Sequence, residues 1–298
     1  MTEVELVNPH QNFSIQRRIT SETSQKLFHL SLEEIAGQAH SHTVAAQKWL
    51  SSRAPQGAEF QGAGIVATST GIREGLLNLA HDARFPAGTP SEAVDEEIEA
   101  VKSFFAGRGV PFMWWLSPMA TPADMSERLL RHGMVLLEYR LPTLVAPLPT
   151  CKGGPAYNPE IEVWQANSVA DLRAASAIRH AAFNFPKDSA LSYFEDMAED
   201  WLRGEPARLF VARVGREGPP TGIGALVMGA GLPGVYAMAT LPACEGKGLG
   251  KAILTHILAA ASAAGHERIV LTAGARAYSL YRKFGFEHIY EYKLFGLP

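Results

Sequence analysis

Cysteine, surplus charge and long apolar runs are all scarce in this sequence. The two cysteines, Cys151 and Cys244, lie far apart and form no Cys-x-x-Cys or Cys/His cluster, which excludes a disulfide framework or a zinc site of usual spacing. Lys and Arg number 27 against 30 Asp and Glu, a net charge of −3, whereas nucleic-acid binders usually carry a large cationic surplus. No apolar stretch reaches the roughly 18 residues of a membrane span, and no secretory or lipidation signal is found. We therefore expect a cytoplasmic protein without a metal, nucleic-acid or membrane partner.

A segment rich in proline and glycine divides the chain near its midpoint. Residues 146–160 contain four Pro and two Gly, and such a composition is typical of a linker because proline removes a backbone donor and glycine adds freedom. The sequence therefore predicts two domains, 1–150 and 151–298, each of mixed helix and strand.

The C-terminal half alternates between strand and helix patterns. Strands are predicted at 161–166, 208–214, 223–229, 235–241, 268–273 and 286–295. Helices are predicted at 168–184, 189–203, 250–264 and 277–284. Gly265 and Gly285 follow the last two helices, where a left-handed residue commonly ends a helix.

The end of the N-terminal half repeats this order. A helix, a strand, a short helix and a second strand are predicted at 91–107, 110–117, 122–132 and 134–145. Gly133 then corresponds to Gly285, at an offset of 152 residues. Similarity at half the chain length predicts a duplicated fold, with coincidence as the alternative.

A glycine cluster, EGKGLG at residues 245–250, follows a strand and a Pro-containing turn and opens a helix. Glycines let successive amides point into one hollow, and the start of the helix adds about half a positive charge, which suits a pyrophosphate. A glycine-rich turn without a ligand is the alternative. A P-loop is excluded because Ala252 follows Lys251, and GAGLPG at 229–234 joins two strands as a hairpin instead of opening a nucleotide-binding helix.

Two motifs of this half occur in a fixed order. The first, a strand followed by Gln/Arg-x-x-Gly-x-Gly/Ala and a helix, is matched by VYAMATLPACEGKGLGKAIL (235–254), except that Glu245 replaces Gln or Arg. The second, a strand followed by Ala-x-x-x-Tyr-x-x-x-Gly-Phe, is matched by IVLTAGARAYSLYRKFGFE (269–287). Together they resemble the GNAT superfamily of acyl-CoA-dependent N-acyltransferases over residues 160–298.

The resemblance implies a mixed α/β (α+β) fold of tandem GNAT type, with a splayed, mostly antiparallel sheet flanked by helices in each half. It implies acetyl-CoA as co-substrate, held between the fourth and fifth strands of the C-terminal half. The implied reaction is direct transfer of the acetyl group to a primary amine of a small molecule. The alternatives are a GNAT-like acyl-CoA-binding or scaffold protein that has lost catalysis, and an enzyme acting on a protein or peptide amine. An oligomer is possible.

The resemblance also implies roles for particular residues. The Met238 N–H would stabilise the oxyanion, and Tyr281 would protonate the departing thiolate. The residues expected to contact acetyl-CoA are Met238, Ala239, Thr240, Glu245, Gly246, Lys247, Gly248, Leu249, Gly250, Lys251 and Tyr281. The Glu245 carboxylate would repel phosphate unless it turns to solvent or Lys247 and Lys251 offset it. Gly274 stands where many members have Asn.

No single residue is identified as the base that removes the ammonium proton. The candidates are His180, Asp188, Glu195, Asp196 and Tyr236, with water as a further possibility. In the N-terminal half, Leu129 takes the place of Tyr281, and Pro86 and Pro90 remove amide donors. We therefore expect that half to bind no CoA and to pack against the catalytic half.

Overall fold

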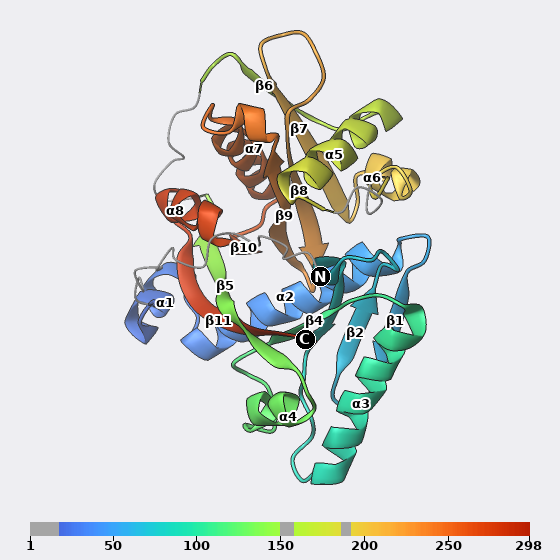
Figure 1. The fold of residues 1–298 in the computed structure, drawn as a ribbon. Helices are drawn as coiled ribbons and strands as arrows, with labels where there is room; N and C mark the ends of the chain where they lie inside the picture. Colours follow the sequence, from blue (N-terminus) through green and yellow to red (C-terminus); the bar gives the residue numbers. More distant parts are fainter. Residues whose placement is uncertain (1–17, 150–157, 186–191) are drawn as a thin grey trace.

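The computed structural model describes residues 18–149, 158–185 and 192–298 (Figure 1). The strands are β1 (Ala58–Gln61), β2 (Val66–Ser69), β3 (Asn78–His81), β4 (Met113–Leu116), β5 (Val135–Pro147), β6 (Ile161–Gln165), β7 (Ala207–Val214), β8 (Gly222–Gly229), β9 (Leu232–Thr240), β10 (Arg268–Thr272) and β11 (Glu287–Gly296). The helices are α1 (Ser21–Phe28), α2 (Leu32–Ser52), α3 (Ser91–Arg108), α4 (Met125–Arg131), α5 (Val169–Ala182), α6 (Ala198–Arg203), α7 (Leu249–Ala263) and α8 (Ala275–Lys283).

The strands form one mixed sheet in the order β1-β2-β3-β4-β11-β5-β10-β9-β8-β7-β6. Most neighbours are antiparallel, and the parallel pairs are β3 with β4 and β9 with β10. The predicted class, a mostly antiparallel α/β sheet flanked by helices, is confirmed. The sheet is continuous through both halves, whereas the sequence predicted a sheet in each.

The two halves exchange their last strands. β11, which ends the C-terminal half, lies between β4 and β5 and pairs Leu294 with Trp115. β5, which ends the N-terminal half, lies beside β10 and pairs Val145 with Val270. The division at residue 150 stays a prediction. Residues 150–157 of the predicted linker 146–160 lie outside the described ranges.

The predicted repeat of elements is present. The series α3, β4, α4, β5 recurs as α7, β10, α8, β11. Gly133 and Gly285 both follow the short helix with positive φ, +78° and +88°. Gly109 and Gly265 follow the long helix in the same way, with φ of +65° and +83°. Glycine is favoured at such helix ends because a Cβ disfavours the left-handed region.

One predicted helix is much shorter than expected. The pattern predicted a helix over 189–203, but α6 begins only at Ala198, and residues 192–197 form turns. The reason is visible at Phe194, whose amide donates to the Ser176 hydroxyl at 3.1 Å instead of to a helical carbonyl. Residues 189–191 lie outside the described part of the chain.

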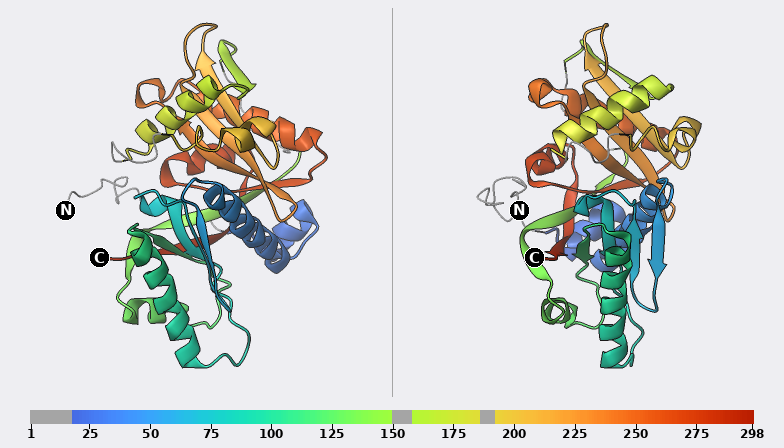
Figure 2. Two further views of the ribbon diagram at one scale, coloured as in Figure 1. Left: turned by 90° about the vertical axis from the view of Figure 1, so that its right-hand side faces the viewer. Right: turned by 45° about the vertical axis from the view of Figure 1, so that its right-hand side comes forward.

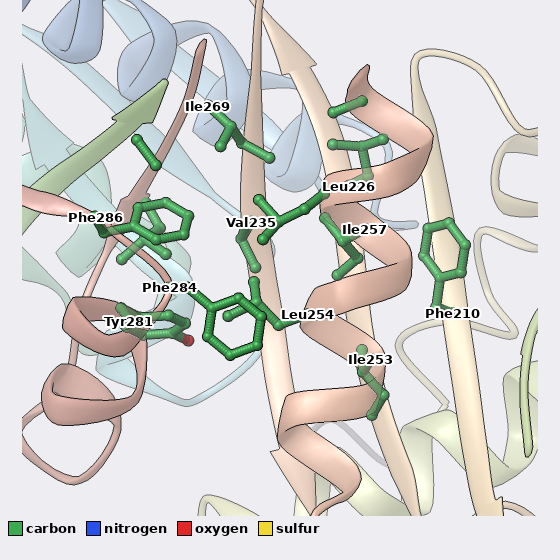
Figure 3. Close-up of a cluster of buried hydrophobic side chains, with 14 of the residues drawn as sticks. Phe210, Leu226, Val235, Ile253, Leu254, Ile257, Ile269, Tyr281, Phe284 and Phe286 are labelled. Atoms are coloured by element: carbon green, nitrogen blue, oxygen red, sulfur yellow. The ribbon is translucent and has the colours of Figure 1, made fainter. Parts of the chain in front are cut away.

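Helices cover both faces of the C-terminal part of the sheet (Figure 2). α7 packs on one face, where Ile253, Leu254 and Ile257 contact strand residues such as Val235 (Figure 3). α5 and α6 pack on the other face. Each fully buried side chain of this size stabilises the fold by about 1.5–3 kcal/mol, so α7 and its N-terminus are held firmly against the strands. Among helices in the described ranges, none has the length and apolarity needed to cross a bilayer.

Candidate active site

Strands β9 and β10 separate soon after they meet. Only Gly234 and Val235 of β9 pair with β10, opposite Val270 and Leu271. Beyond them, residues 236–240 have no partner in β10 within the described pairing and remain partly exposed, although β9 lies well inside the sheet. An opening therefore exists between two central strands, and it leaves one edge of the β9 main chain available.

A β-bulge in β9 lies at this opening. The register with β8 shifts between Ile223 and Ala225, so that Ala237 and Met238 together oppose Gly224. Ala237 has φ +50°, in the left-handed region that residues with a Cβ rarely adopt. A Cβ at Gly224 would collide with the Met238 sulfur and a methyl group of Ile253, which favours glycine there. The bulge fixes Met238, the predicted oxyanion donor, at the opening.

The predicted glycine loop leads from this opening into α7. Gly246 and Gly248 have φ of +74° and +95°, and Gly248 caps the helix without a side-chain bond. In the described part of the chain, the amides of residues 246–251 donate to no protein acceptor. The Glu245 amide, by contrast, already donates to the Pro242 carbonyl at 3.3 Å. The loop presents a row of amides at a positive helix end, which is a receptor for an anion.

Glu245 is paired, but not with the residues expected from the sequence. Its carboxylate lies 2.6 Å from the Arg276 guanidinium at the start of α8. Glu245 is also partly turned to solvent, as one of the two expected alternatives requires. The offset of its charge by Lys247 and Lys251 stays a prediction, and the Lys247 ammonium lies 4.0 Å from the Cys244 sulfur. The ion pair with Arg276 reduces the repulsion that Glu245 would exert on a phosphate. Its contribution is modest because both side chains are largely exposed.

Tyr281 lies on α8 with 5% of its surface exposed. Its ring meets Phe286 edge-on, with centroids 5.8 Å apart, and lies next to Phe284 and Leu254 (Figure 3). Burial raises the pKa of the phenol well above its usual value, so the hydroxyl stays protonated at neutral pH. Tyr281 therefore fills the core and also retains the proton that an acid must supply.

The candidate bases are not brought together. The structure pairs Glu195 with Arg173 at 2.9 Å, and Asp196 accepts a hydrogen bond from Ser192 at 2.8 Å. His180 packs edge-on against Phe185, and Asp188 lies outside the described residues.

Tyr236 is the candidate that β9 itself carries. Its hydroxyl lies 3.1 Å from Nε2 of His42, on α2. Sequence reasoning missed His42 because it lies 194 residues from Tyr236 and belongs to no motif.

The N-terminal half contains a counterpart of the opening. β3 pairs with β4 only at Leu79 and Ala80, as β9 does with β10. Asp82 follows two residues later with φ +59°, as Ala237 follows the last paired residue of β9 with φ +50°. The same local backbone geometry is therefore present in both halves.

In the N-terminal half, the chain fills this opening itself. Thr121 donates its amide to the Ala83 carbonyl at 2.9 Å and accepts the Phe85 amide at 3.2 Å, in the manner of an added parallel strand. Thr121 belongs to residues 117–124, which lie between β4 and α4. In the C-terminal half only residues 273–274 separate β10 from α8. Leu129 is fully buried where the other half has Tyr281.

Comparisons with known proteins agree with this geometry. Residues 205–288 match the family model of the acetyltransferase (GNAT) domain. A GCN5-related N-acetyltransferase from Kribbella flavida superposes with a TM-score of 0.62 at 20% identity, covering 87% of this chain and 95% of its own. A tandem GNAT protein from the clavulanic acid biosynthesis pathway gives 0.57 at 13% identity, covering 89% and 94%.

A glucosamine N-acetyltransferase region of a fungal multi-domain GH3 β-N-acetylglucosaminidase gives a TM-score of 0.61 at 12% identity. That alignment covers 94% of this chain but 38% of the fungal protein. Among curated proteins, none matches the sequence. The match to the GNAT acetyltransferase model is confined to residues 205–288, and the chain has the fold of GCN5-related N-acetyltransferases.

Proposed function

We propose that this chain is an acetyl-CoA-dependent N-acetyltransferase that acts on the primary amine of a small molecule, with one working site per chain. The observation that carries the proposal is the continuity between the unpaired edge of β9 and the row of amides at residues 246–251. Acetyl-CoA has a long arm with amide groups and a pyrophosphate. The unpaired main chain of β9 can form hydrogen bonds with the arm, and the amides of residues 246–251 can donate to the pyrophosphate.

The N-terminal half supports this arrangement by analogy within the molecule. Thr121 bonds to Ala83 and Phe85, which stand one and three residues after Asp82, the left-handed residue that follows β3. Met238 and Thr240 stand at the same positions after Ala237 in β9. We assign these two residues to the pantetheine arm, which would extend the sheet as Thr121 does.

The reaction then needs few side chains. The neutral amine attacks the thioester carbonyl, the N–C bond forms and the C–S bond breaks. The Met238 N–H stabilises the oxyanion of the tetrahedral intermediate. Tyr281 gives its proton to the departing thiolate and regains one from solvent, while the nitrogen releases its excess proton to solvent.

A second candidate is an acyl-CoA-binding protein without transferase activity. Two observations favour it. Glu245 places a carboxylate at the start of the amide row, and Gly274 gives α8 no side-chain cap, where a polar residue would otherwise add a contact.

One experiment separates the two functions. The full chain is incubated with acetyl-CoA and glucosamine, tyramine, spermidine or single amino acids, and the released CoA thiol is measured alongside calorimetric binding of CoA. We expect thiol release with at least one amine and one CoA per chain. Binding without release with any amine, including N-terminal peptides, would favour the second candidate. Two CoA molecules per chain would contradict the single site.

A further inference from the structure

Helix α2 of the N-terminal half lies against strands β8 and β9 of the C-terminal half (Figure 1). Its His42 is 1% exposed. A Cβ at Gly229 would collide with the α2 main chain, and a Cβ at Gly234 would collide with the His42 ring. The outer glycines of GAGLPG therefore serve the approach of α2, a role unrelated to nucleotide binding.

Both ring nitrogens of His42 have partners. Nδ1 lies 2.8 Å from the carbonyl oxygen of Leu232 and 3.2 Å from that of Gly229. Carbonyl oxygens only accept hydrogen bonds, so Nδ1 carries the proton. Burial lowers the pKa of His42 to about 4, which keeps the ring neutral and leaves Nε2 as an acceptor. The Tyr236 hydroxyl, 3.1 Å from Nε2, is therefore the donor in their hydrogen bond.

The Tyr236 hydroxyl is thus held in one orientation. Its single proton is directed at His42, so toward any further partner, including the neighbouring Thr43 hydroxyl, the oxygen can only accept. Burial, together with the neighbouring Tyr290, raises the pKa of Tyr236, and the group stays a phenol at neutral pH. Its side chain remains partly exposed and directly precedes the bulge residues Ala237 and Met238. A fixed hydrogen-bond acceptor is therefore carried by the residue two positions before Met238 in β9.

We propose that the N-terminal half completes the amine side of this site: His42 positions the Tyr236 hydroxyl, whose oxygen accepts a hydrogen bond from the N–H of the incoming primary amine. The inference rests on the proposed function. Tyr236 is the residue that touches the substrate, and His42 acts through it. As the N–C bond forms and the C–S bond breaks, the excess proton of the nitrogen passes to solvent, because buried His42 does not hold it.

The surroundings of the pair contain little charge. The ionisable side chains that influence Tyr236 are the phenols of Tyr290 and Tyr292 on β11. The shift of His42 is caused by burial and by the two carbonyls of the hairpin. The acceptor thus offers no negative charge that would hold the amine in its ammonium form.

Variants of the pair test the inference. In Tyr236→Phe and in His42→Leu, we expect kcat/KM for the best amine of the panel to fall about tenfold, as for the loss of one hydrogen bond, while the dissociation constant of acetyl-CoA is unchanged. The double variant should lose no more than either single one, because the two side chains act as a unit. His42→Gln should recover most of the activity, since its amide can both accept from Tyr236 and donate to a carbonyl.

A matched control is Tyr193→Phe, which removes a hydroxyl bonded to the Leu50 carbonyl of α2 at 2.8 Å and leaves β9 unchanged. It should lower the thermal midpoint without changing kcat/KM for the amine. Activity of Tyr236→Phe equal to that of the unmodified chain, or additive losses in the double variant, would overturn the inference.

Two further measurements test the roles of Tyr236 and His42 without depending on transferase activity. Binding of the amine to the CoA complex is compared between the unmodified chain and Tyr236→Phe, which requires no turnover, and equal affinities would refute the role of Tyr236. Nitrogen NMR of the imidazole at pH 7 should show a protonated Nδ1 and a bare Nε2 in His42. The opposite tautomer would remove the basis of the inference even in an active enzyme.

Discussion

Few side chains contribute polar groups to the opening between β9 and β10, because the main chain supplies most of them. The proposed oxyanion donor is the Met238 amide, and the proposed anion receptor consists of the amides of residues 246–251. A main-chain receptor depends on backbone shape, so unusual side chains such as Glu245 and Gly274 leave it in place. At the residue scale, the side chains with the largest expected effects are those that donate or bind a proton.

Tyr281 is the first of these. Replacing it with Phe removes the hydroxyl but keeps the ring that packs against Phe286. We expect kcat to fall roughly 100-fold, the scale of general acid catalysis, with little change in the affinity for acetyl-CoA. Steady-state kinetics and calorimetry measure both. Tyr278→Phe, one turn earlier on α8 and hydrogen-bonded to His288 at 3.3 Å, is the control that should keep its kcat. Equal losses in the two variants would assign Tyr281 a packing role only.

His42 also determines how the stability of the fold depends on pH. Burial lowers its pKa from 6.5 to about 4 in the folded chain. Between these values the unfolded chain binds the extra proton, so the free energy of unfolding falls as the pH decreases through this window. The shift corresponds to roughly 3 kcal/mol lost between pH 7 and pH 4.

Urea unfolding of the unmodified chain and of His42→Gln across that window measures this loss. The variant should show a flatter dependence, although His81, whose pKa burial lowers to about 3, contributes a second loss of the same sign. His266→Gln, at a partly exposed position, serves as the control. Parallel curves for His42→Gln and the unmodified chain would contradict the prediction.

At the scale of elements, local signals account for what the sequence predicted well. The predicted helix ends at Gly265 and Gly285 are confirmed because a left-handed residue acts within its own turn. The bulge was not predicted, since it depends on how Ala237 and Met238 pair with Gly224 on another strand. The exchange of β5 and β11 and the contact of His42 with β9 were missed for the same reason. Pairing between residues far apart in the sequence produces no pattern within either segment.

The loop before α7 offers a prediction at this scale. Gly248 has φ +95°, so Gly248→Ala strains the backbone and should turn the amides of the first helical turn away from a common point. We expect the affinity for CoA to fall at least tenfold by calorimetry. Gly88→Ala is the matched control, because Gly88 has φ +84° in the corresponding loop of the N-terminal half and open space around it. Gly88→Ala should destabilise the fold about as much as Gly248→Ala but leave CoA binding unchanged. Equal losses of CoA affinity in the two variants would argue against the loop before α7 as the CoA site.

Across the whole molecule, the two halves share a backbone plan but differ at the opening. Each has a parallel strand pair that separates before a left-handed residue, at Asp82 and at Ala237. Thr121 fills the first opening, whereas the chain turns directly into α8 at the second. We therefore expect the N-terminal half to contribute structure to its neighbour instead of a second CoA site. It supplies β5 beside β10 and α2 behind β9.

This exchange predicts that neither half folds alone. Residues 158–298 without β5 would expose one edge of β10 and leave β11 without either of its partners. They would also lose Leu144 and Ala146 from the core that packs under α7. Expressed separately, each half should lack a cooperative unfolding transition, whereas the two halves expressed together should co-elute as a 1:1 complex that binds CoA. We expect the long sheet edges left unpaired in a separate half to associate with other chains. A separate C-terminal half that unfolds cooperatively at the thermal midpoint of the full chain would show instead that the shared strands are dispensable.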